Sequence, residues 1–239
     1  MIRRILIPAM IALSFLTASP ALKEYTVQLR IQPDGTGQGT ASFRITNCTP
    51  GNLDVPFGFQ DFQNLKLLKG PAGAGVEAAK HGGGQPHLHL FFPLGVGEKA
   101  TLELSFEVPQ AFSYSESGRG SGAVKTRLVK HAFVNTQESE IGEYRFEVLL
   151  PKGTMVQAIR EQQPKPGKSE SEPRVRLGKI EGYQSATLQF KKVKLGDDTS
   201  MSLEIVNTRK SLVWLFAGLV LAALYLVYFR GDYFPPEQA

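Results

Sequence analysis

Apolar and polar residues alternate along most of the chain after residue 22. In the stretch EYTVQLRIQ (24–32), a strand would place on one face the apolar residues Tyr25, Val27, Leu29 and Ile31. The turn signature PDGTG follows, in which Pro33 presets φ and the glycines allow a positive φ. A second alternating stretch, GTASFRITN (39–47), then predicts the partner strand of a hairpin.

Further short stretches have a similar pattern and are separated by turn residues. They lie at 53–59, 64–70, 87–94, 99–108, 127–135, 142–151, 154–161, 173–180, 183–193 and 199–207. No amphipathic helical pattern precedes residue 211. Many short strands at regular spacing predict an all-β fold, and we expect an immunoglobulin-like sandwich.

The expected strands fall into two sets. A Ser/Gly-rich stretch over 110–124, which contains YSESGRGSG, predicts a flexible linker between residues 22–109 and residues 125–208. Each set has about the size of a small sandwich domain, which favours two tandem sandwiches. One larger sandwich with a long loop is the alternative. A polar, proline-containing stretch at 162–173 predicts an exposed loop.

The C-terminal run SLVWLFAGLVLAALYLVYF (211–229) contains no charged residue. A helix of this length spans roughly 28 Å, close to the ~30 Å hydrocarbon core of a bilayer. Basic residues flank the run, and aromatic residues lie near both ends, as is typical of a membrane span. The pattern predicts a transmembrane helix followed by a short cytoplasmic tail (230–239). Gly218 and Ala222 form a small-xxx-small pair that would let another helix approach closely.

The N-terminus has the pattern of a secretory signal peptide over residues 1–21. Arg3 and Arg4 precede an apolar stretch, and small residues follow it. We therefore expect residues 22–210 to lie outside the cytoplasm, in the periplasm or extracellular space, on a protein that crosses the inner membrane once. The bilayer would be one partner. A membrane protein is the other expected partner, because only residues 208–210 separate the last expected strand from the membrane.

The charge is moderate and dispersed. Lys and Arg number 27 against 22 Asp and Glu, and several of the excess positive charges flank the two apolar segments. Nucleic-acid binding proteins cluster Lys and Arg on one face, and no such cluster occurs here. Cys48 is the sole cysteine, so it cannot form an internal disulfide. It is expected to be a small buried residue, and an intermolecular disulfide is the alternative.

The sequence PHLHLFF contains the best candidate metal ligands. On a strand, His87 and His89 would point to the same side and could share a metal. A further ligand would have to come from His81, His131 or a carboxylate. The alternative is an ordinary polar strand face opposite the buried residues Leu88, Leu90 and Phe92. His131 is more typical of a hydrogen-bonded structural histidine.

No catalytic motif is recognisable. The Gly-rich stretches at 70–75, 81–84 and 118–122 precede no predicted helix, which phosphate binding would require. We therefore predict a protein that is not an enzyme and needs no cofactor, and that binds or scaffolds other components of the cell envelope. The alternatives are a metal-binding module using His87 and His89, or a glycan- or lipid-binding domain. Tyr114 and the neighbouring Phe112 are the candidate aromatic platform for a glycan, and the alternative for Phe112 is a position in the core.

Overall fold

The computed structural model describes residues 21–46, 51–79, 85–95, 97–117, 124–137, 139–161 and 174–228. They form fourteen strands and one helix. The elements are β1 (Ala21–Ile31), β2 (Gly37–Thr46), β3 (Gly51–Pro56), β4 (Gln63–Lys69), β5 (Gly75–Ala79), β6 (His87–Phe92), β7 (Lys99–Val108), β8 (Ser113–Ser117), β9 (Val124–Val134), β10 (Ile141–Leu149), β11 (Thr154–Glu161), β12 (Arg174–Ile180), β13 (Tyr183–Val193), β14 (Asp198–Asn207) and α1 (Thr208–Tyr228). The prediction of a β-rich chain with one C-terminal helix is confirmed.

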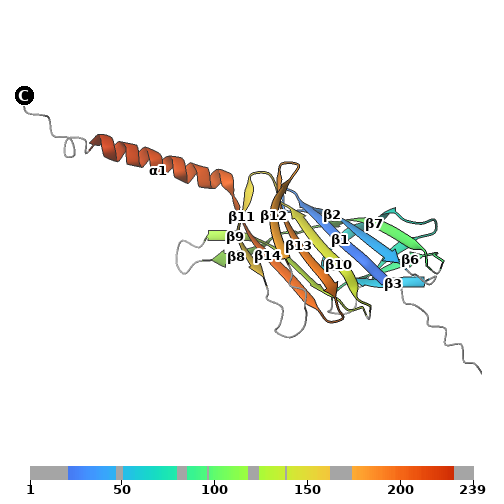
Figure 1. The fold of residues 1–239 in the computed structure, drawn as a ribbon. Coiled ribbons are helices and arrows are strands. Elements are labelled where there is room, and N and C mark those ends of the chain that lie inside the picture. Colours follow the sequence, from blue (N-terminus) through green and yellow to red (C-terminus); the bar gives the residue numbers. More distant parts are fainter. Residues whose placement is uncertain are drawn as a thin grey trace, which may run out of the picture.

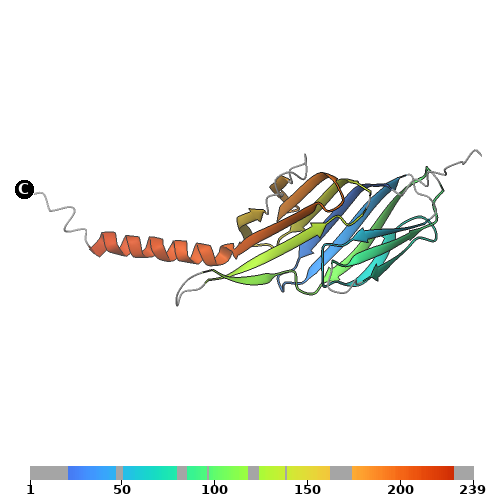
Figure 2. The same cartoon turned by 90° about the horizontal axis from the view of Figure 1, so that it is seen from below.

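The strands form three sheets. A central seven-stranded sheet has the order β12-β13-β10-β1-β2-β7-β4. A four-stranded sheet has the order β11-β14-β9-β8, and a three-stranded sheet has the order β3-β6-β5. Figures 1 and 2 show the central sheet in one layer and the two smaller sheets in the layer behind it. Within the central sheet β1 and β10 run parallel, whereas the other pairs are antiparallel.

The hairpin predicted at the start of the chain is present. Strands β1 and β2 pair from Ala21 and Thr46 to Ile31 and Gly37. Gly35 has a φ of 95°, which only glycine adopts without strain. The alternating residues of β1 also divide as predicted, since Tyr25, Val27, Leu29 and Ile31 are at most 1% exposed.

Side chains from all three sheets form one hydrophobic core. Tyr25 illustrates how the layers meet. Its ring stacks on Phe43 of β2 with centroids 4.6 Å apart and meets Phe133 of β9 edge-on at 5.7 Å. Its hydroxyl donates a hydrogen bond to the carbonyl of Pro56 at the end of β3, at 3.3 Å. The smaller sheets therefore cover the apolar face of the central sheet.

The central sheet does not follow the division into two tandem sandwiches that the sequence favoured. Its strands β1, β2, β4 and β7 precede the predicted linker at 110–124, and β10, β12 and β13 follow it. The two sets join in the middle of the sheet through the parallel pair β1 and β10. Residues 113–117 of the predicted linker form β8, which pairs with β9, while residues 118–123 lie outside the described part. The alternating stretches in the sequence predict how many strands form, but they do not predict which strands pair.

The C-terminal helix is present, but the prediction that it spans a membrane requires a correction. Helix α1 begins directly after β14 and extends away from the β layers (Figure 2). Within the described residues, no helix meets the combined length and apolarity needed to cross a bilayer. The predicted leader up to residue 20, Phe229, and the predicted tail at 230–239 lie outside the described residues.

Candidate functional site

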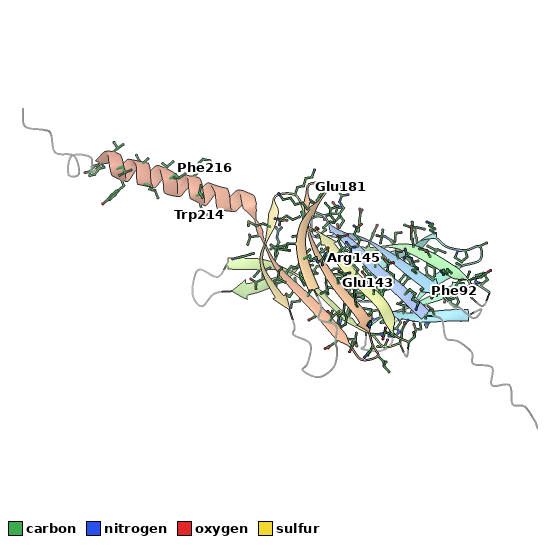
Figure 3. The ribbon with its side chains drawn as sticks, viewed as in Figure 1. Phe92, Glu143, Arg145, Glu181, Trp214 and Phe216 are labelled. Atoms are coloured by element: carbon green, nitrogen blue, oxygen red, sulfur yellow. The ribbon has the colours of Figure 1, made fainter. Side chains whose placement is uncertain are left out.

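The second face of the central sheet is polar, and the described residues form no sheet over it. Because side chains alternate across a strand, the residues between the core positions of β1, β2, β7, β10 and β13 all point to this side. Figure 3 shows Glu143 and Arg145 of β10 on this face, with the smaller sheets behind it. Across β1 the polar set is Glu24, Thr26, Gln28 and Arg30, each partly exposed.

Two hollows lie on this face and share the residues Gln28 and Thr40. The smaller has a volume of about 300 Å³ and reaches Glu24, Arg145 and Glu147. The larger has a volume of about 490 Å³ and reaches Arg30, Lys66 and Glu107. We call the two together the polar trough. It crosses the sheet from β10 through β1, β2 and β7 to β4.

A buried carboxylate lies at one end of the polar trough. Glu147 is only 7% exposed. The Gln28 side-chain amide donates to its Oε2 at 3.0 Å, and the Thr187 hydroxyl donates to its Oε1 at 3.1 Å. The guanidinium of Arg145 lies 3.7 Å from the same Oε1. Gln28 and Thr187 come from β1 and β13, the strands that flank β10, so strand pairing itself positions them.

Most of the charged groups around the polar trough contact another charged or polar side chain. Arg44 and Glu24 form an ion pair at 2.9 Å, and the Asn64 amide donates to Glu107 at 2.7 Å. Arg30 donates to the Tyr183 hydroxyl, and its guanidinium carbon lies 4.4 Å from the centre of that ring. The site therefore presents acids and bases side by side rather than a field of one sign.

Between these charges lies a floor of hydroxyl groups. Thr26 pairs in register with Ser42, and Thr40 pairs with Ser105. The side chains of these four residues make no hydrogen bond to other described residues. All four lie in a hollow of the trough. Their donors and acceptors are consequently available to solvent or to a ligand.

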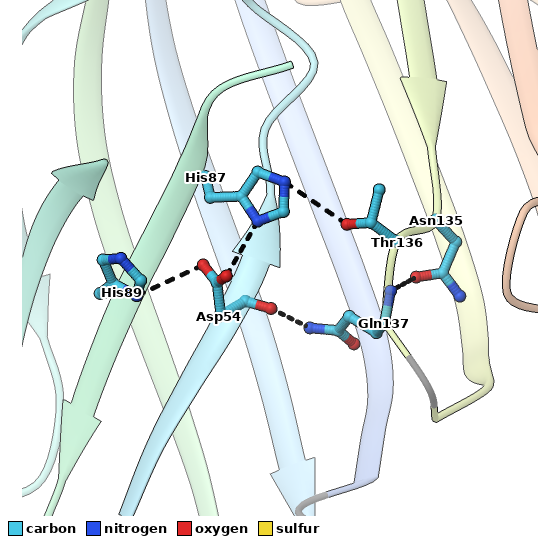
Figure 4. Close-up of polar contacts among 6 residues, drawn as sticks. All are labelled: Asp54, His87, His89, Asn135, Thr136 and Gln137. Atoms are coloured by element: carbon cyan, nitrogen blue, oxygen red, sulfur yellow. Dashed lines mark hydrogen bonds and ion pairs between the residues drawn. The ribbon is translucent and has the colours of Figure 1, made fainter. Parts of the chain in front are cut away.

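The predicted pair His87 and His89 lies on the same side of β6, with Leu88, Leu90 and Phe92 buried on the other side. Figure 4 shows that both imidazoles contact one carboxylate. His87 Nδ1 lies 3.0 Å from Asp54 Oδ2, and His89 Nδ1 lies 3.3 Å from Asp54 Oδ1.

Two residues of the loop after β9 contact this cluster. His87 Nε2 lies 3.5 Å from the Thr136 hydroxyl, and the Gln137 amide donates to the Asp54 carbonyl at 2.7 Å. Among the described residues, no group of three or more His, Cys, Asp or Glu side chains is arranged to hold a metal ion. His81 and Cys48 lie outside the described residues. The arrangement links β3, β6 and the loop that leads to β10.

His131 is a structural residue, as its sequence context indicated. It is 2% exposed and stacks on Phe146 with ring centroids 3.8 Å apart. Its Nε2 lies 2.5 Å from the Tyr144 hydroxyl, whereas its Nδ1 has no hydrogen-bond partner among the described residues. Burial lowers the pKa of His131 to about 3, so the imidazole is neutral at pH 7. A side chain at Gly58 would place its Cβ 2.3 Å from the His131 ring, which explains the glycine there.

The aromatic platform predicted at Phe112 and Tyr114 is wrong for Phe112. This ring is 5% exposed and belongs to the core, so it cannot stack on a sugar. The side chain of Tyr114 lies outside the described part. Gly218 lies on α1, and a Cβ added there would meet nothing within 4 Å. The face that Gly218 and Ala222 share is therefore not covered at Gly218 by the described parts of the chain.

Sequence reasoning missed the polar trough. Each strand showed an ordinary alternation of polar residues, which normally marks a solvated face. The site arises only when five strands from different parts of the chain lie in register, since Glu147, Gln28, Thr40, Ser105 and Lys66 are successive partners across the sheet.

The sequence matches no known protein family and no curated protein. Solved structures with a similar arrangement include a candidate protease from Parabacteroides distasonis ATCC 8503, at 12% identity and a TM-score of 0.45. A second is native leukotriene A4 hydrolase from Saccharomyces cerevisiae, at 9% identity and a TM-score of 0.44. A third is a mutant M1 zinc metallopeptidase from Deinococcus radiodurans bound to Tyr-Ser-Ala, at 8% identity and a TM-score of 0.41. Each match covers 77% of this chain but only 40%, 29% and 42% of the respective structures.

Proposed function

We propose that this protein is a non-enzymatic binding or scaffolding component of the cell envelope, held at a membrane by α1. The observation that supports it most strongly is the surface of that helix. From Trp214 to Tyr228 its large apolar side chains are 53–84% exposed, and no charged residue interrupts them. Such a helix lacks the polar face of a helix at the surface of a soluble domain. In water this surface would drive association, whereas the apolar part of a membrane would take up its side chains without the helix having to cross the bilayer.

The β structure would then be the binding part. Its apolar residues are used in one core, while the central sheet keeps a polar face with two hollows. The leader-like start of the sequence places this part outside the cytoplasm in our proposal. Because α1 follows β14 without a linker, the β structure would lie close to the bilayer. A partner embedded in the same membrane would be within reach.

Membrane attachment is tested by fractionating cells that express the full chain, followed by alkaline carbonate extraction. We expect the protein to remain with the membrane pellet. The double variant Leu219→Arg/Leu221→Arg should move to the extract, because arginine in the apolar part of a bilayer costs about 2.5–3.5 kcal/mol. Leu177→Arg is the matched control, because Leu177 is 56% exposed on β12 and should leave fractionation unchanged. A wild-type chain that is extracted by carbonate contradicts membrane attachment.

The scaffolding role is tested by gentle detergent extraction and affinity purification, with a tag inserted between residues 162 and 173. A membrane protein recovered in stoichiometric amount supports the proposal. Recovery of the chain alone, at monomer size and after chemical crosslinking in intact membranes, contradicts it.

A further inference from the structure

The hydroxyl floor of the polar trough has hydrogen-bonding capacity that the fold does not use. Thr26, Thr40, Ser42 and Ser105 are small and lie between larger charged side chains, so their oxygens line the bottom of an open hollow. Each hydroxyl can donate one hydrogen bond and accept two. A ligand that satisfies them must itself both donate and accept.

The charges around the trough select for a neutral ligand. An anion over the smaller hollow would meet the carboxylate of Glu147, which is buried and therefore poorly screened. A cation would meet the guanidinium of Arg145 beside it. The larger hollow also contains both signs of charge, since Arg30 and Lys66 line it together with Glu107. A ligand that fills the whole polar trough is therefore favoured neither by a net positive nor by a net negative charge.

The lining also excludes apolar and strand-like ligands. Of the described residues, Phe106 is the sole large apolar one that contributes to either hollow. It is 2% exposed because its ring packs across Gly39 on the core side. An acyl chain or an apolar peptide side chain would find no surface to bury. A peptide could not add as a strand, because the trough crosses β1, β2 and β7, whose backbone groups already pair on both sides.

We propose that the polar trough binds a neutral oligosaccharide. Sugar hydroxyls both donate and accept, and they suit the hydroxyl floor together with the side-chain amides of Gln28 and Gln38 and the planar groups of Glu147 and Arg145. The volumes of about 300 and 490 Å³ fall in the range of small-molecule sites, and their common wall makes one elongated site for several sugar units. This inference does not depend on membrane attachment.

The experiment uses the full chain in a detergent that contains no sugar, because maltoside detergents carry a neutral sugar themselves. The labelled protein is applied to a glycan array that contains neutral, sialylated and sulfated oligosaccharides, and the strongest neutral glycan is titrated by calorimetry. We expect binding of neutral glycans in preference to charged ones. The detergent solution without protein serves as the blank.

Two matched threonine variants decide whether the trough is the site. Thr40→Val removes a hydroxyl that lines both hollows while keeping the β-branched shape. It should weaken binding about threefold to tenfold, the worth of one hydrogen bond. Thr101→Val makes the same change on the same face of β7, outside both hollows, and should bind as wild type does. Adding Ser42→Ala to Thr40→Val should weaken binding further.

Three results would overturn the inference. They are the absence of binding to any neutral glycan on the array, a preference for sialylated or sulfated glycans, and equal affinity in Thr40→Val and Thr101→Val. Both variants change a threonine that is not buried to another good strand former. Near-identical circular dichroism spectra will therefore show that a loss of binding is not a loss of fold.

Discussion

The two faces of the central sheet are built by the same strands but have opposite properties. On the inner face, aromatic rings stack on each other in the core, as Phe133 does on Tyr144 at 4.0 Å. On the outer face, Glu147 accepts hydrogen bonds from Gln28 and Thr187, whereas the hydroxyls of Thr26, Thr40, Ser42 and Ser105 make no hydrogen bond to the described residues. Residues next to each other in sequence therefore point to opposite faces of the sheet and have different roles. The inner face holds the three sheets together, and the outer face remains available for binding.

The largest effect is expected from truncating the inner face. Phe146 is fully buried and stacks on His131, so Phe146→Ala should lower the free energy of unfolding by about 3–5 kcal/mol. Arg145→Ala changes the adjacent residue on the outer face and should lower it by no more than about 0.5 kcal/mol. Urea unfolding of the full chain in detergent micelles measures both. Similar losses in the two variants would contradict the division between the faces.

A titratable group on the inner face should make the protein sensitive to acid. The pKa of His131 is about 3 in the folded protein and about 6.5 in an unfolded chain. Below pH 6.5 the His131 imidazole becomes protonated in the unfolded chain but stays neutral in the folded protein until the pH approaches 3. Stability should therefore fall as the pH drops toward 3, by at most about 1.4 kcal/mol per pH unit from this group.

Urea unfolding at pH 7, 5.5 and 4.5 tests this expectation against His131→Gln, which keeps a polar partner for Tyr144 but does not titrate. The variant should lose less stability between pH 7 and pH 4.5 than the wild type. Parallel losses in the two proteins would show that His131 does not cause the acid sensitivity.

A smaller loss of stability is expected from adding a side chain at Gly39, over which the ring of Phe106 packs on the inner face. A Cβ at Gly39 would lie 2.1 Å from the ring of Phe106, so Gly39→Ala should force the ring to move and cost about 1–3 kcal/mol. Gly75→Ala on β5 meets nothing closer than 3.8 Å and should be close to neutral. Thermal unfolding of both variants measures the difference. A neutral Gly39→Ala would mean that the ring shifts without loss.

The smallest effect is expected on the outer face. Arg44 and Glu24 form an ion pair at 2.9 Å, but their side chains are 62% and 39% exposed. Solvent screens such a pair, so Arg44→Ala should change the free energy of unfolding by no more than about 1 kcal/mol. Raising the salt concentration should reduce the difference from wild type. A loss above 2 kcal/mol would mean that the outer face also contributes to folding.

The alternation of residues predicted much of this fold. It correctly identified the two faces of β1 and the buried side of β6, because burial of every second residue leaves a direct pattern in the sequence. It could not predict that β1 lies beside β10, because 119 positions separate each pair of partners and no local signal joins them. For the same reason the preference for two tandem sandwiches did not describe the central sheet.

The candidate sites could also be predicted from the sequence only where their residues lie close together in the chain. His87 and His89 could be recognised as neighbours because they lie two residues apart on one strand, but their common partner Asp54 comes from β3. For Phe112 the sequence left open a glycan platform and a core position, and the structure places the ring in the core. The polar trough left no local signal at all.

The sequence by itself determined the β-rich class, the side of each strand that is buried and the apolar helix at the C-terminal end, because these depend on residues close together in the chain. The tertiary structure decided which strands pair, and thereby which polar residues meet. Glu147 receives hydrogen bonds from Gln28 and Thr187, residues that lie 119 and 40 positions away. Such contacts depend on the register between distant strands, which is set by packing of the whole core.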